Sequence, residues 1–413
     1  MPDSRNSDLK SYLRKFTSPT ISKRSTKLVI GSFGGEKVPM FINEFWTAEQ
    51  RKASSIHEIS YRACFKPQLP KFFIDLFTKN GDIVYDPFSG RGTTAIEAGL
   101  CGCKVIANDS NPLSKLMTEP RFTPPTISAV EKRLNDISRD GPPSELDLSM
   151  FYHPKTEREI VAIRNYIAKK RQKGEVDYLD RWIAMVATNR LTGHSSGFLS
   201  VYTLPPNQAV SQQSQMRINM RRNQVPEYRD THNLIIRKTK SLIRTLTASQ
   251  VRQLKRASKQ AQFLTTDSRY TPEIVTESVQ LTVTSPPFLD IVQYQDDNWL
   301  RCWFNNLDSN AISKRITMAK SVEEWTRVIR DVFYEIYRLT KKGGWLAFEV
   351  GEVRKGTVRL EEEVVPLGLD AGFTCEAIMI NSQEFTKTSH IWGVDNMGCG
   401  TNTNRIVIFR KEK

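Results

Sequence analysis

The sequence predicts an α/β protein with a mostly parallel sheet, split by a helical and strongly basic insertion. Residues 82–109 predict a strand, a glycine turn, a helix and a second strand, which together begin a βαβ unit. The same alternation returns near residue 261. The residues between these two parts show the apolar spacing of helices and carry most of the net positive charge. A single α/β domain is therefore expected to be discontinuous in sequence.

The first βαβ unit follows from local patterns. A short apolar run rich in β-propensity ends at Asp86, and glycines break the pattern soon afterwards. The expected elements are a strand at 82–88, a turn at 89–92, a helix at 93–102 and a strand at 104–109. After Pro120, proline-containing stretches mark a linker. Helical patterns follow at residues 154–173, 177–191 and 233–260.

The α/β pattern resumes at residue 261. Strands are expected at residues 262–267, 279–285, 345–353, 373–381 and 405–411. An amphipathic helix is expected over 322–344, closed by Gly343 and Gly344, because glycine readily adopts the left-handed conformation that ends a helix. A further helix is expected over 360–372, bent or interrupted at Pro366.

These patterns divide the chain into three parts. We expect a polar, basic N-terminal arm at residues 1–55, an α/β domain formed by 56–120 together with 261–413, and an inserted helical region at 121–260. No apolar run approaches the ~18 residues needed to cross a bilayer, and the N-terminus lacks the apolar core of a signal peptide. The expected location is the cytoplasm, without a membrane partner.

Cysteine and histidine usage argues against a metal site. The six cysteines are scattered without a CxxC pair, and the five histidines show no ligand spacing. Reduced, mostly buried thiols are the expectation.

The positive charge is concentrated in one segment. The formal net charge is +15, and residues 217–259 contain twelve Lys or Arg against two acidic residues. A solvated helix face normally mixes both signs, so this excess favours contact with phosphates and hence a nucleic-acid partner.

The glycine turn that follows Asp86 has the composition of a ligand-binding loop. A nucleotide-binding Walker A loop would need a Lys after Gly92, and none is present. A dinucleotide fingerprint is nearly matched, but the negative charge of Asp86 beside the turn disfavours a pyrophosphate and favours a cationic ligand. Asp109, at the end of the next strand, suits the paired hydroxyls of a ribose. A ligand with a cationic end and a ribose fits S-adenosylmethionine.

A second motif ends the apolar strand at 279–285. Residues 284–288 read Thr-Ser-Pro-Pro-Phe, and adjacent prolines cannot continue a strand because they lack the N–H that ladder pairing needs. Taken alone, this motif is explained by strand termination. Its combination with the glycine loop favours a functional role.

The segments at 86–99 and 284–288 together resemble the amino-methylating DNA methyltransferases, which modify N4 of cytosine or N6 of adenine. Residues 57–74 resemble the leading motif of that family, and the later motifs are resembled by residues 298–307, 341–353 and 403–409. The resemblance covers residues 56–120 and 261–410. It implies a Rossmann-like, S-adenosylmethionine-dependent methyltransferase fold and a bacterial or archaeal protein associated with DNA.

The resemblance also implies roles for individual residues in holding S-adenosylmethionine. The methionine half of the cofactor is expected at Phe88, Gly90, Gly92 and Thr93. Asp86 is expected near its amino group, Asp109 at the ribose, and Asp267 at the adenine amine, with Phe65 as a weaker candidate. For Asp109 and Asp267 the alternative is helix capping or turn formation.

The second motif would carry the methyl transfer. Ser285 Oγ and the Pro286 carbonyl are expected to accept hydrogen bonds from an exocyclic amine, Pro287 to hold that carbonyl rigidly, and Phe288 to stack on an extruded base. None of the six cysteines follows a proline, which argues against the covalent mechanism of carbon-5 cytosine methylation. Serine at the first position resembles the N4-cytosine branch, whereas the adenine branch usually has Asp or Asn there.

Target recognition is expected in the insertion at 121–260. The candidates for phosphate or guanine contacts are Arg217, Arg221, Arg222 and Arg237, and the Gln and Asn residues of 207–224 could read base edges. The alternative is a purely structural helical cap. Double-stranded DNA is the expected partner, and the resemblance alone suggests a cognate restriction endonuclease. Adenine methylation, RNA methylation and a catalytically silent DNA-binding protein remain alternatives.

Overall fold

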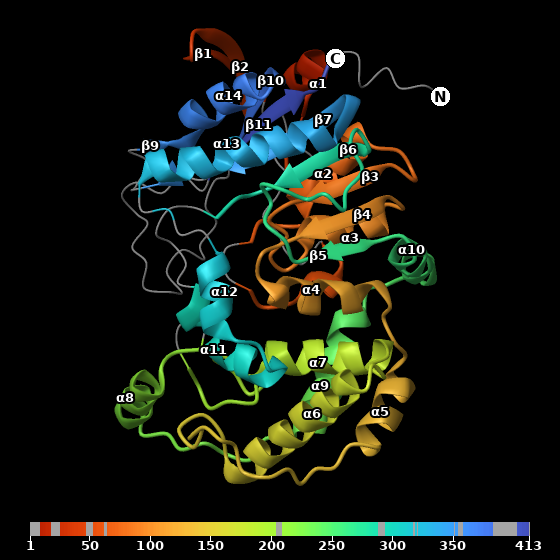
Figure 1. Ribbon diagram of the computed structural model, residues 1–413, viewed down its shortest axis with the longest axis vertical. Coiled ribbons are helices and arrows are strands. Elements are labelled where there is room, and N and C mark those ends of the chain that lie inside the picture. The colour runs from red at the N-terminus through yellow and green to blue at the C-terminus, as the bar shows by residue number, and fades with distance from the viewer. Residues whose placement is uncertain are drawn as a thin grey trace.

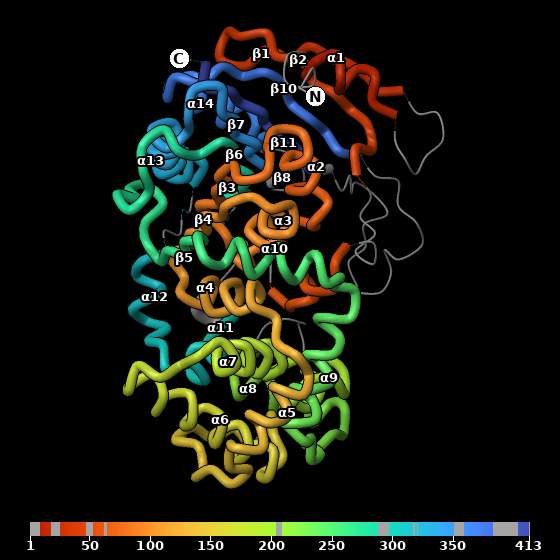
Figure 2. The backbone as a smooth tube through the Cα atoms, turned by 90° about the vertical axis from the view of Figure 1, so that its right-hand side faces the viewer, coloured from red at the N-terminus to blue at the C-terminus, as the bar shows by residue number. Residues whose placement is uncertain are grey.

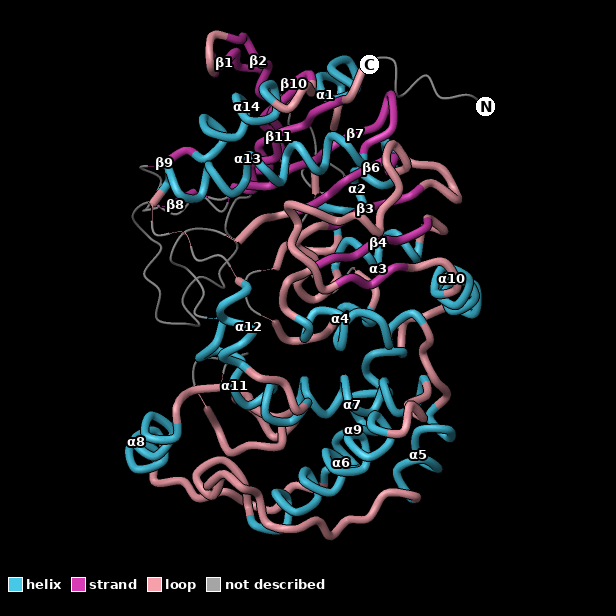
Figure 3. The backbone as a smooth tube through the Cα atoms, viewed as in Figure 1, coloured by secondary structure: helices cyan, strands magenta, loops and turns pink. Residues whose placement is uncertain are grey.

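The computed structural model describes most of the chain (Figure 1). The described residues are 9–17, 25–46, 53–61, 64–203, 209–287, 294–316, 319, 321–350, 352–353, 358–382 and 403–412. Strands gather in one half of the molecule, and helices alone form the other half (Figure 3). The sequence prediction of an α/β fold is confirmed.

One large sheet has the strand order β1-β2-β10-β11-β7-β6-β3-β4-β5. Its strands are β1 (Lys27–Phe33), β2 (Glu36–Asn43), β3 (Ile83–Asp86), β4 (Lys104–Asn108), β5 (Gln262–Leu264), β6 (Val279–Thr284), β7 (Thr340–Val350), β10 (Thr374–Ser382) and β11 (Thr403–Arg410). The five strands from β5 to β7 are parallel, as is the β2–β10 pair, whereas β11 runs antiparallel to both neighbours. The sheet is therefore mostly parallel, as expected. The short strands β8 (Glu352–Val353) and β9 (Val358–Arg359) pair separately.

The strand order reverses direction between β3 and β6. From β3 the chain continues to β4 and β5 on one side, and it then returns to β6 and β7 on the other. In open α/β sheets, ligands bind beside the carboxyl ends of the strands at such a switch point. The ends of β3 and β6 therefore mark the place to look for a site.

Helices cover both faces of the sheet (Figure 2). One face carries α2 (Gln68–Phe77) and α3 (Thr93–Leu100), and the other carries α13 (Val322–Leu339) and α14 (Leu360–Asp370). Side chains of β7 alternate between them: Ala347 joins the core under α2 and α3, and Leu346 and Phe348 join the core under α13 and α14. As predicted, α14 contains Pro366.

The helical half is built mainly from the region between β4 and β5, where the described residues form helices and no strand. Its helices are α4 (Pro112–Thr118), α5 (Ile127–Asn135), α6 (Pro154–Gln172), α7 (Tyr178–Arg190), α8 (Gln212–Arg222), α9 (Thr231–Ile243) and α10 (Ala248–Ser258). Helix α10 returns to the sheet and packs on α3. After β6, α11 (Tyr294–Asn305) packs against α6 and α7, and α12 (Ser309–Arg315) follows it.

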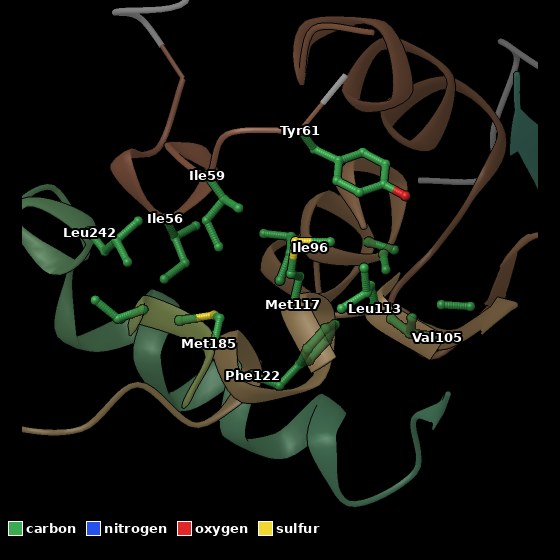
Figure 4. Packing of buried hydrophobic residues seen from close by; sticks show 14 of the residues in the cluster. Ile56, Ile59, Tyr61, Ile96, Val105, Leu113, Met117, Phe122, Met185 and Leu242 are labelled. Carbon is green, nitrogen blue, oxygen red and sulfur yellow. The ribbon is translucent and has the colours of Figure 1, made fainter. Parts of the chain in front are cut away.

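A continuous apolar core joins the two halves (Figure 4). Ile56 and Ile59, from the segment before α2, contribute to it together with Ile96 of α3. Met185 of α7 and Leu242 of α9 belong to the same core. The predicted boundaries at residues 121 and 260 therefore do not separate two cores, because residues from both parts pack in the same core.

Two expectations about local structure are wrong. Residues 27–43, expected in a polar arm, form a hairpin that joins the sheet through β2, because Val38 and Phe41 are buried there and Gly34 and Gly35 make the turn. Helix α1 (Leu9–Lys15) packs nearby. Gly343 and Gly344 do not close α13, which ends at Leu339. They lie within β7, which begins by pairing with β6.

Candidate cofactor and catalytic site

The carboxyl ends of β3 and β6 meet at the switch point. Asp86 ends β3 and Thr284 ends β6, and the Thr284 hydroxyl donates to Asp86 Oδ1 at 2.7 Å. The backbone N–H of Phe88 donates to the same oxygen at 3.1 Å. Burial raises the pKa of Asp86 to about 7. A cationic group beside Asp86 would favour the ionised carboxylate and lower that pKa again.

The glycine turn wraps around the carboxylate of Asp109. Gly90 has a φ of 51°, and its N–H donates to Asp109 Oδ2 at 2.8 Å. The N–H of Asn111 donates to Oδ1 at 2.9 Å, and Asn111 itself caps α4. Burial raises the pKa of Asp109 to about 6. Since a carboxylate has about four acceptor positions, Asp109 keeps capacity for further donors such as hydroxyl groups.

Gly92 is required by packing. Its φ is 73°, and a Cβ built on it would lie 2.3 Å from Thr118 Oγ1 and Cγ2. Any side chain at this position would therefore clash with α4 whether or not a ligand is bound. The predicted contact of Gly92 with the cofactor stays a prediction.

Two buried hydroxyl groups beside this turn have no hydrogen-bond partner among the described residues. They are Ser89 Oγ and Thr118 Oγ1. By contrast, Thr93 Oγ1 accepts from Arg91 Nε at 3.2 Å, and Phe88 is half-buried against the core. Burying a hydroxyl group without a hydrogen-bond partner costs free energy. These two hydroxyl groups are therefore suited to bind polar atoms of a ligand.

The segment before α2 is fastened to the glycine turn by a buried arginine. Arg91 donates to the carbonyl of Ile59 at 3.0 Å and to that of Phe65 at 3.4 Å. The buried Arg121 donates in turn to the carbonyls of Arg91 and Ile56. The structure thus brings Phe65, a predicted cofactor residue, to the turn through its backbone.

Asp267 lies in a turn at the same edge of the sheet. Ser268 Oγ donates to the Pro87 carbonyl at 2.7 Å, which fixes this turn to the loop after β3. The Asp267 carboxylate accepts from the backbone N–H of Arg269 at 2.9 Å and forms an exposed ion pair with the Arg269 guanidinium. These contacts are those of the turn-forming alternative, and the role of Asp267 toward a cofactor stays a prediction.

The Ser-Pro-Pro motif is held from two directions. The Ser285 hydroxyl lies beside the carboxylate of Glu349, whose pKa it lowers, and Trp325 Nε1 donates to the Pro287 carbonyl at 3.0 Å. No hydrogen bond to the Pro286 carbonyl comes from the residues that the structure describes. Phe288 lies outside them. The predicted roles of Ser285 Oγ and the Pro286 carbonyl as acceptors for an amine stay predictions.

The sequence interpretation missed Glu349. It lies near the end of β7, where it is buried, and Asn404 Nδ2 of the adjacent β11 donates to it. Burial raises its pKa to about 7, against the effect of the Asn404 and Ser285 hydrogen bonds. The available signal was a carboxylate inside an otherwise apolar strand, since a buried charge in such a place needs partners.

The predicted DNA-contacting arginines are exposed. Arg217, Arg221 and Arg222 lie on α8, and Arg237 lies on α9. The Arg222 guanidinium stacks 3.8 Å from the centre of the Tyr202 ring.

The expectation that the Gln and Asn residues of 207–224 read base edges is wrong for most of those described. Gln212, Gln215 and Asn219 donate to the carbonyls of Asp147, Tyr202 and Met150 respectively, at 2.6–3.0 Å. Gln224 also donates to the Tyr202 carbonyl. Their amides fix α8 and the residue after it to neighbouring loops.

The basic segment does not form one surface. Helix α10 and the residue that caps its end carry four exposed cations: Arg252, Lys255, Arg256 and Lys259. Arg256 lines a shallow cavity with Gly81, Gly102 and Lys104, which precede or begin β3 and β4. Helix α10 therefore lies at the amino edge of the sheet, while α8 lies on the side of the carboxyl edge (Figure 1).

No helix in the described part of the chain is long and apolar enough to cross a membrane. Within the same part, no cluster of His, Cys, Asp and Glu has the arrangement of a metal site.

Comparison with known proteins agrees with this geometry. The family model described as DNA methylase matches residues 13–115. Type II methyltransferase M.MvaI of Kocuria varians is 33% identical over 96 residues, which is 22% of this chain and 20% of that protein. Type II methyltransferase M.MjaII of Methanocaldococcus jannaschii is 32% identical over 91 residues, 22% of this chain and 17% of that protein. A tRNA (guanine(10)-N2)-dimethyltransferase of the same archaeon is 39% identical over 61 residues, 14% of this chain and 17% of that protein.

Residues 13–115 are similar to the DNA methylase family model and to Type II methyltransferases. The resemblance seen in the sequence is thereby confirmed, and with it S-adenosylmethionine as the cofactor that the family implies. The match does not distinguish N4-cytosine from N6-adenine methylation. It also covers only about a fifth of the length of these curated relatives.

Proposed function

We propose that this protein methylates double-stranded DNA, transferring the methyl group of S-adenosylmethionine to the exocyclic N4 amine of a cytosine. One arrangement carries the proposal: Ser285 directly follows β6 beside Asp86 and the glycine turn, and its hydroxyl lies beside the buried Glu349. A polar acceptor thus lies next to a site suited to a cationic ligand. The DNA methylase match supports DNA as the substrate class.

The residues at the carboxyl edge fit the cofactor. Asp86 would face its amino group and Asp109 its ribose, while Ser89 Oγ and Thr118 Oγ1 offer unpaired polar atoms beside the turn. When bound, S-adenosylmethionine supplies a methyl group on a positively charged sulfur. The protein contributes a negative carboxylate for the cationic end and hydrogen-bond acceptors for the polar parts.

Ser285 and the Pro286 carbonyl act on the base. With its proton directed to the neighbouring Glu349, Ser285 Oγ keeps its lone pairs free to accept from an amine N–H. Two acceptors stabilise the positive charge that develops on the amine nitrogen during transfer. Glu349, with a pKa of about 7, then takes up the released proton through the Ser285 hydroxyl. We propose that Phe288 stacks on the extruded base.

Identification of the modified base tests this proposal. Plasmid DNA and bulk RNA would be incubated separately with the protein and tritiated S-adenosylmethionine, digested to nucleosides, and resolved by mass and retention. We expect N4-methyl-2′-deoxycytidine. N6-methyl-2′-deoxyadenosine would overturn the choice of cytosine, which rests on Ser285. Label confined to RNA would overturn DNA as the substrate. RNA is tested because part of the chain is similar to a tRNA methyltransferase.

The variant Ser285→Ala tests the role of Ser285 in the same assay. We expect it to bind S-adenosylmethionine like the parent, because Ser285 faces the base, and to lose on the order of 10²-fold or more in methyl transfer. Cofactor affinity would be measured by calorimetry. Parental turnover in this variant would remove Ser285 from the mechanism.

We propose that α8 forms part of the DNA interface in the region 121–260. Arg221 and Arg222 are exposed there without ionic partners among the described residues. Arg221→Ala/Arg222→Ala should weaken duplex binding and reduce the slope of log affinity against log salt. The control is Arg252→Ala/Arg256→Ala on α10, which removes the same charge at the opposite edge. Equal effects of the two pairs would argue against a specific interface at α8.

A functional pairing with a restriction endonuclease is also proposed. The relatives named Type II methyltransferases support it. DNA modified by this protein should resist cleavage by one Type II endonuclease that cuts at the methylated motif.

A further inference from the structure

Helix α8 is almost free of core packing. It spans eleven residues, of which Gln215 alone is buried, and Met216 and Met220 are 45% and 74% exposed. An isolated helix of this length is marginal in water, so other contacts must hold it. Met216 and Met220 lie one helical turn apart, so the helix presents them together to solvent.

Polar contacts along one side hold the helix in place. Ser211 caps its first turn, and Gln212, Gln215 and Asn219 donate their side-chain amides to carbonyls of neighbouring loops. The three amides lie at the i, i+3 and i+7 spacing of one helix face. The other face is therefore presented to solvent in a fixed orientation.

That presented face forms a single stripe. Its residues, at i, i+3, i+4, i+7 and i+8, are Gln213, Met216, Arg217, Met220 and Arg221, and all five are exposed. The helix contains no acidic residue. Arginine pairs with guanine, glutamine with adenine, and an apolar side chain contacts the methyl group of thymine. The stripe thus combines the three chemistries by which a major groove is read.

The position of α8 relates it to the catalytic motif. The N–H of Ala209 donates to the carbonyl of Asp297 at 3.1 Å, and Trp299 Nε1 donates to the carbonyl of Val210 at 3.3 Å. Both contacts involve α11, which follows the Ser285 motif in the chain. The amino end of α8 is therefore anchored to the element that leads away from the proposed catalytic strand.

We infer that α8 is the recognition helix of the enzyme, and that its exposed stripe enters the major groove of duplex DNA and reads base pairs there. Its eleven residues extend for about 16 Å, which suits a groove about 12 Å wide. Met216 and Met220 supply apolar contacts to thymine methyl groups, and Arg217 and Arg221 supply donors to guanine. The inference rests on the proposed function, because it assigns sequence specificity to the same DNA-modifying reaction.

Methylation mapping at single-base resolution tests the inference. A plasmid library with random inserts would be methylated by the parent and by Met220→Ala, Arg217→Ala, Arg221→Ala and Gln213→Ala, one variant at a time. Base readout predicts that the modified motif becomes degenerate at one or two base pairs, with discrimination there reduced on the order of tenfold or more. Phosphate contact alone would slow methylation uniformly and leave the motif intact.

Control variants keep the outcomes separate. Arg252→Ala and Arg256→Ala on α10 should keep the parental motif. Circular dichroism should show unchanged folding for the α8 variants, since they alter exposed positions. An unchanged motif in all four α8 variants would overturn the recognition helix while leaving the methyltransferase intact. A parent protein that methylates no DNA would overturn the proposed function itself.

Discussion

Ser285 directly follows β6 and lies beside Glu349 of the adjacent parallel strand β7. An ionised Glu349 can only accept a hydrogen bond from Ser285, whereas a neutral carboxyl can also donate to Ser285 Oγ and occupy the lone pair that an amine needs. Methyl transfer should therefore fall as pH decreases through about 7, the pKa to which burial raises Glu349. Glu349→Gln should lose this pH dependence and transfer methyl groups on the order of 10²-fold more slowly at pH 8.

The measurement is the rate of a single turnover against pH at saturating cofactor. Glu362→Gln, at an exposed position of α14, is the matched control and should keep the parental profile. Persistence of the limb near pH 7 in Glu349→Gln would assign it to another group, and Asp86 has a pKa raised to about the same value.

Glu349 also affects stability. Its folded-state pKa of about 7 lies above the ordinary value of 4.5, so the fold favours the neutral carboxyl. This contribution is complete below pH 4.5 and is lost as pH rises through 7. Glu349→Gln should therefore lose less stability than the parent between about pH 5 and pH 8. Urea denaturation at both values measures this, and an equal loss in the two proteins would contradict it.

At the scale of elements, the turn between β3 and α3 depends on Gly92. Gly92→Ala places a Cβ against Thr118 and forces alanine into the left-handed region, so it should destabilise the protein by about 3 kcal/mol. Gly174→Ala is the control, because Gly174 has a φ of 70° with nothing within 4 Å of its added Cβ. It should cost about 1 kcal/mol. Equal costs in urea denaturation would show that the contact with Thr118 is unimportant.

The elements themselves could largely be predicted from the sequence, whereas several of their contacts could not. Alternation and glycine punctuation indicate β3, α3 and β4 because these signals are local. The hydrogen bond between Thr284 and Asp86 joins residues that are 198 positions apart, and no periodicity in the sequence predicts that they meet. Likewise, the amides of α8 resemble base-reading groups in sequence. Their use as anchors depends on carbonyls that only the folded loops bring near.

At the scale of the whole molecule, the insertion and the sheet share one apolar core. Phe122 is fully buried in it, with Ile96 of α3 on the sheet side and Met185 and Leu242 on the helical side (Figure 4). Two halves joined by such a core should unfold together, so urea denaturation should give coincident transitions by tryptophan fluorescence and far-ultraviolet circular dichroism. Phe122→Ala should shift both transitions equally, by about 3–5 kcal/mol, because the cavity removes support from both halves. Val225→Ala, at an exposed position, should shift neither. Separate transitions in the parent, or a shift of only one in Phe122→Ala, would show that the helical insertion folds independently of the sheet.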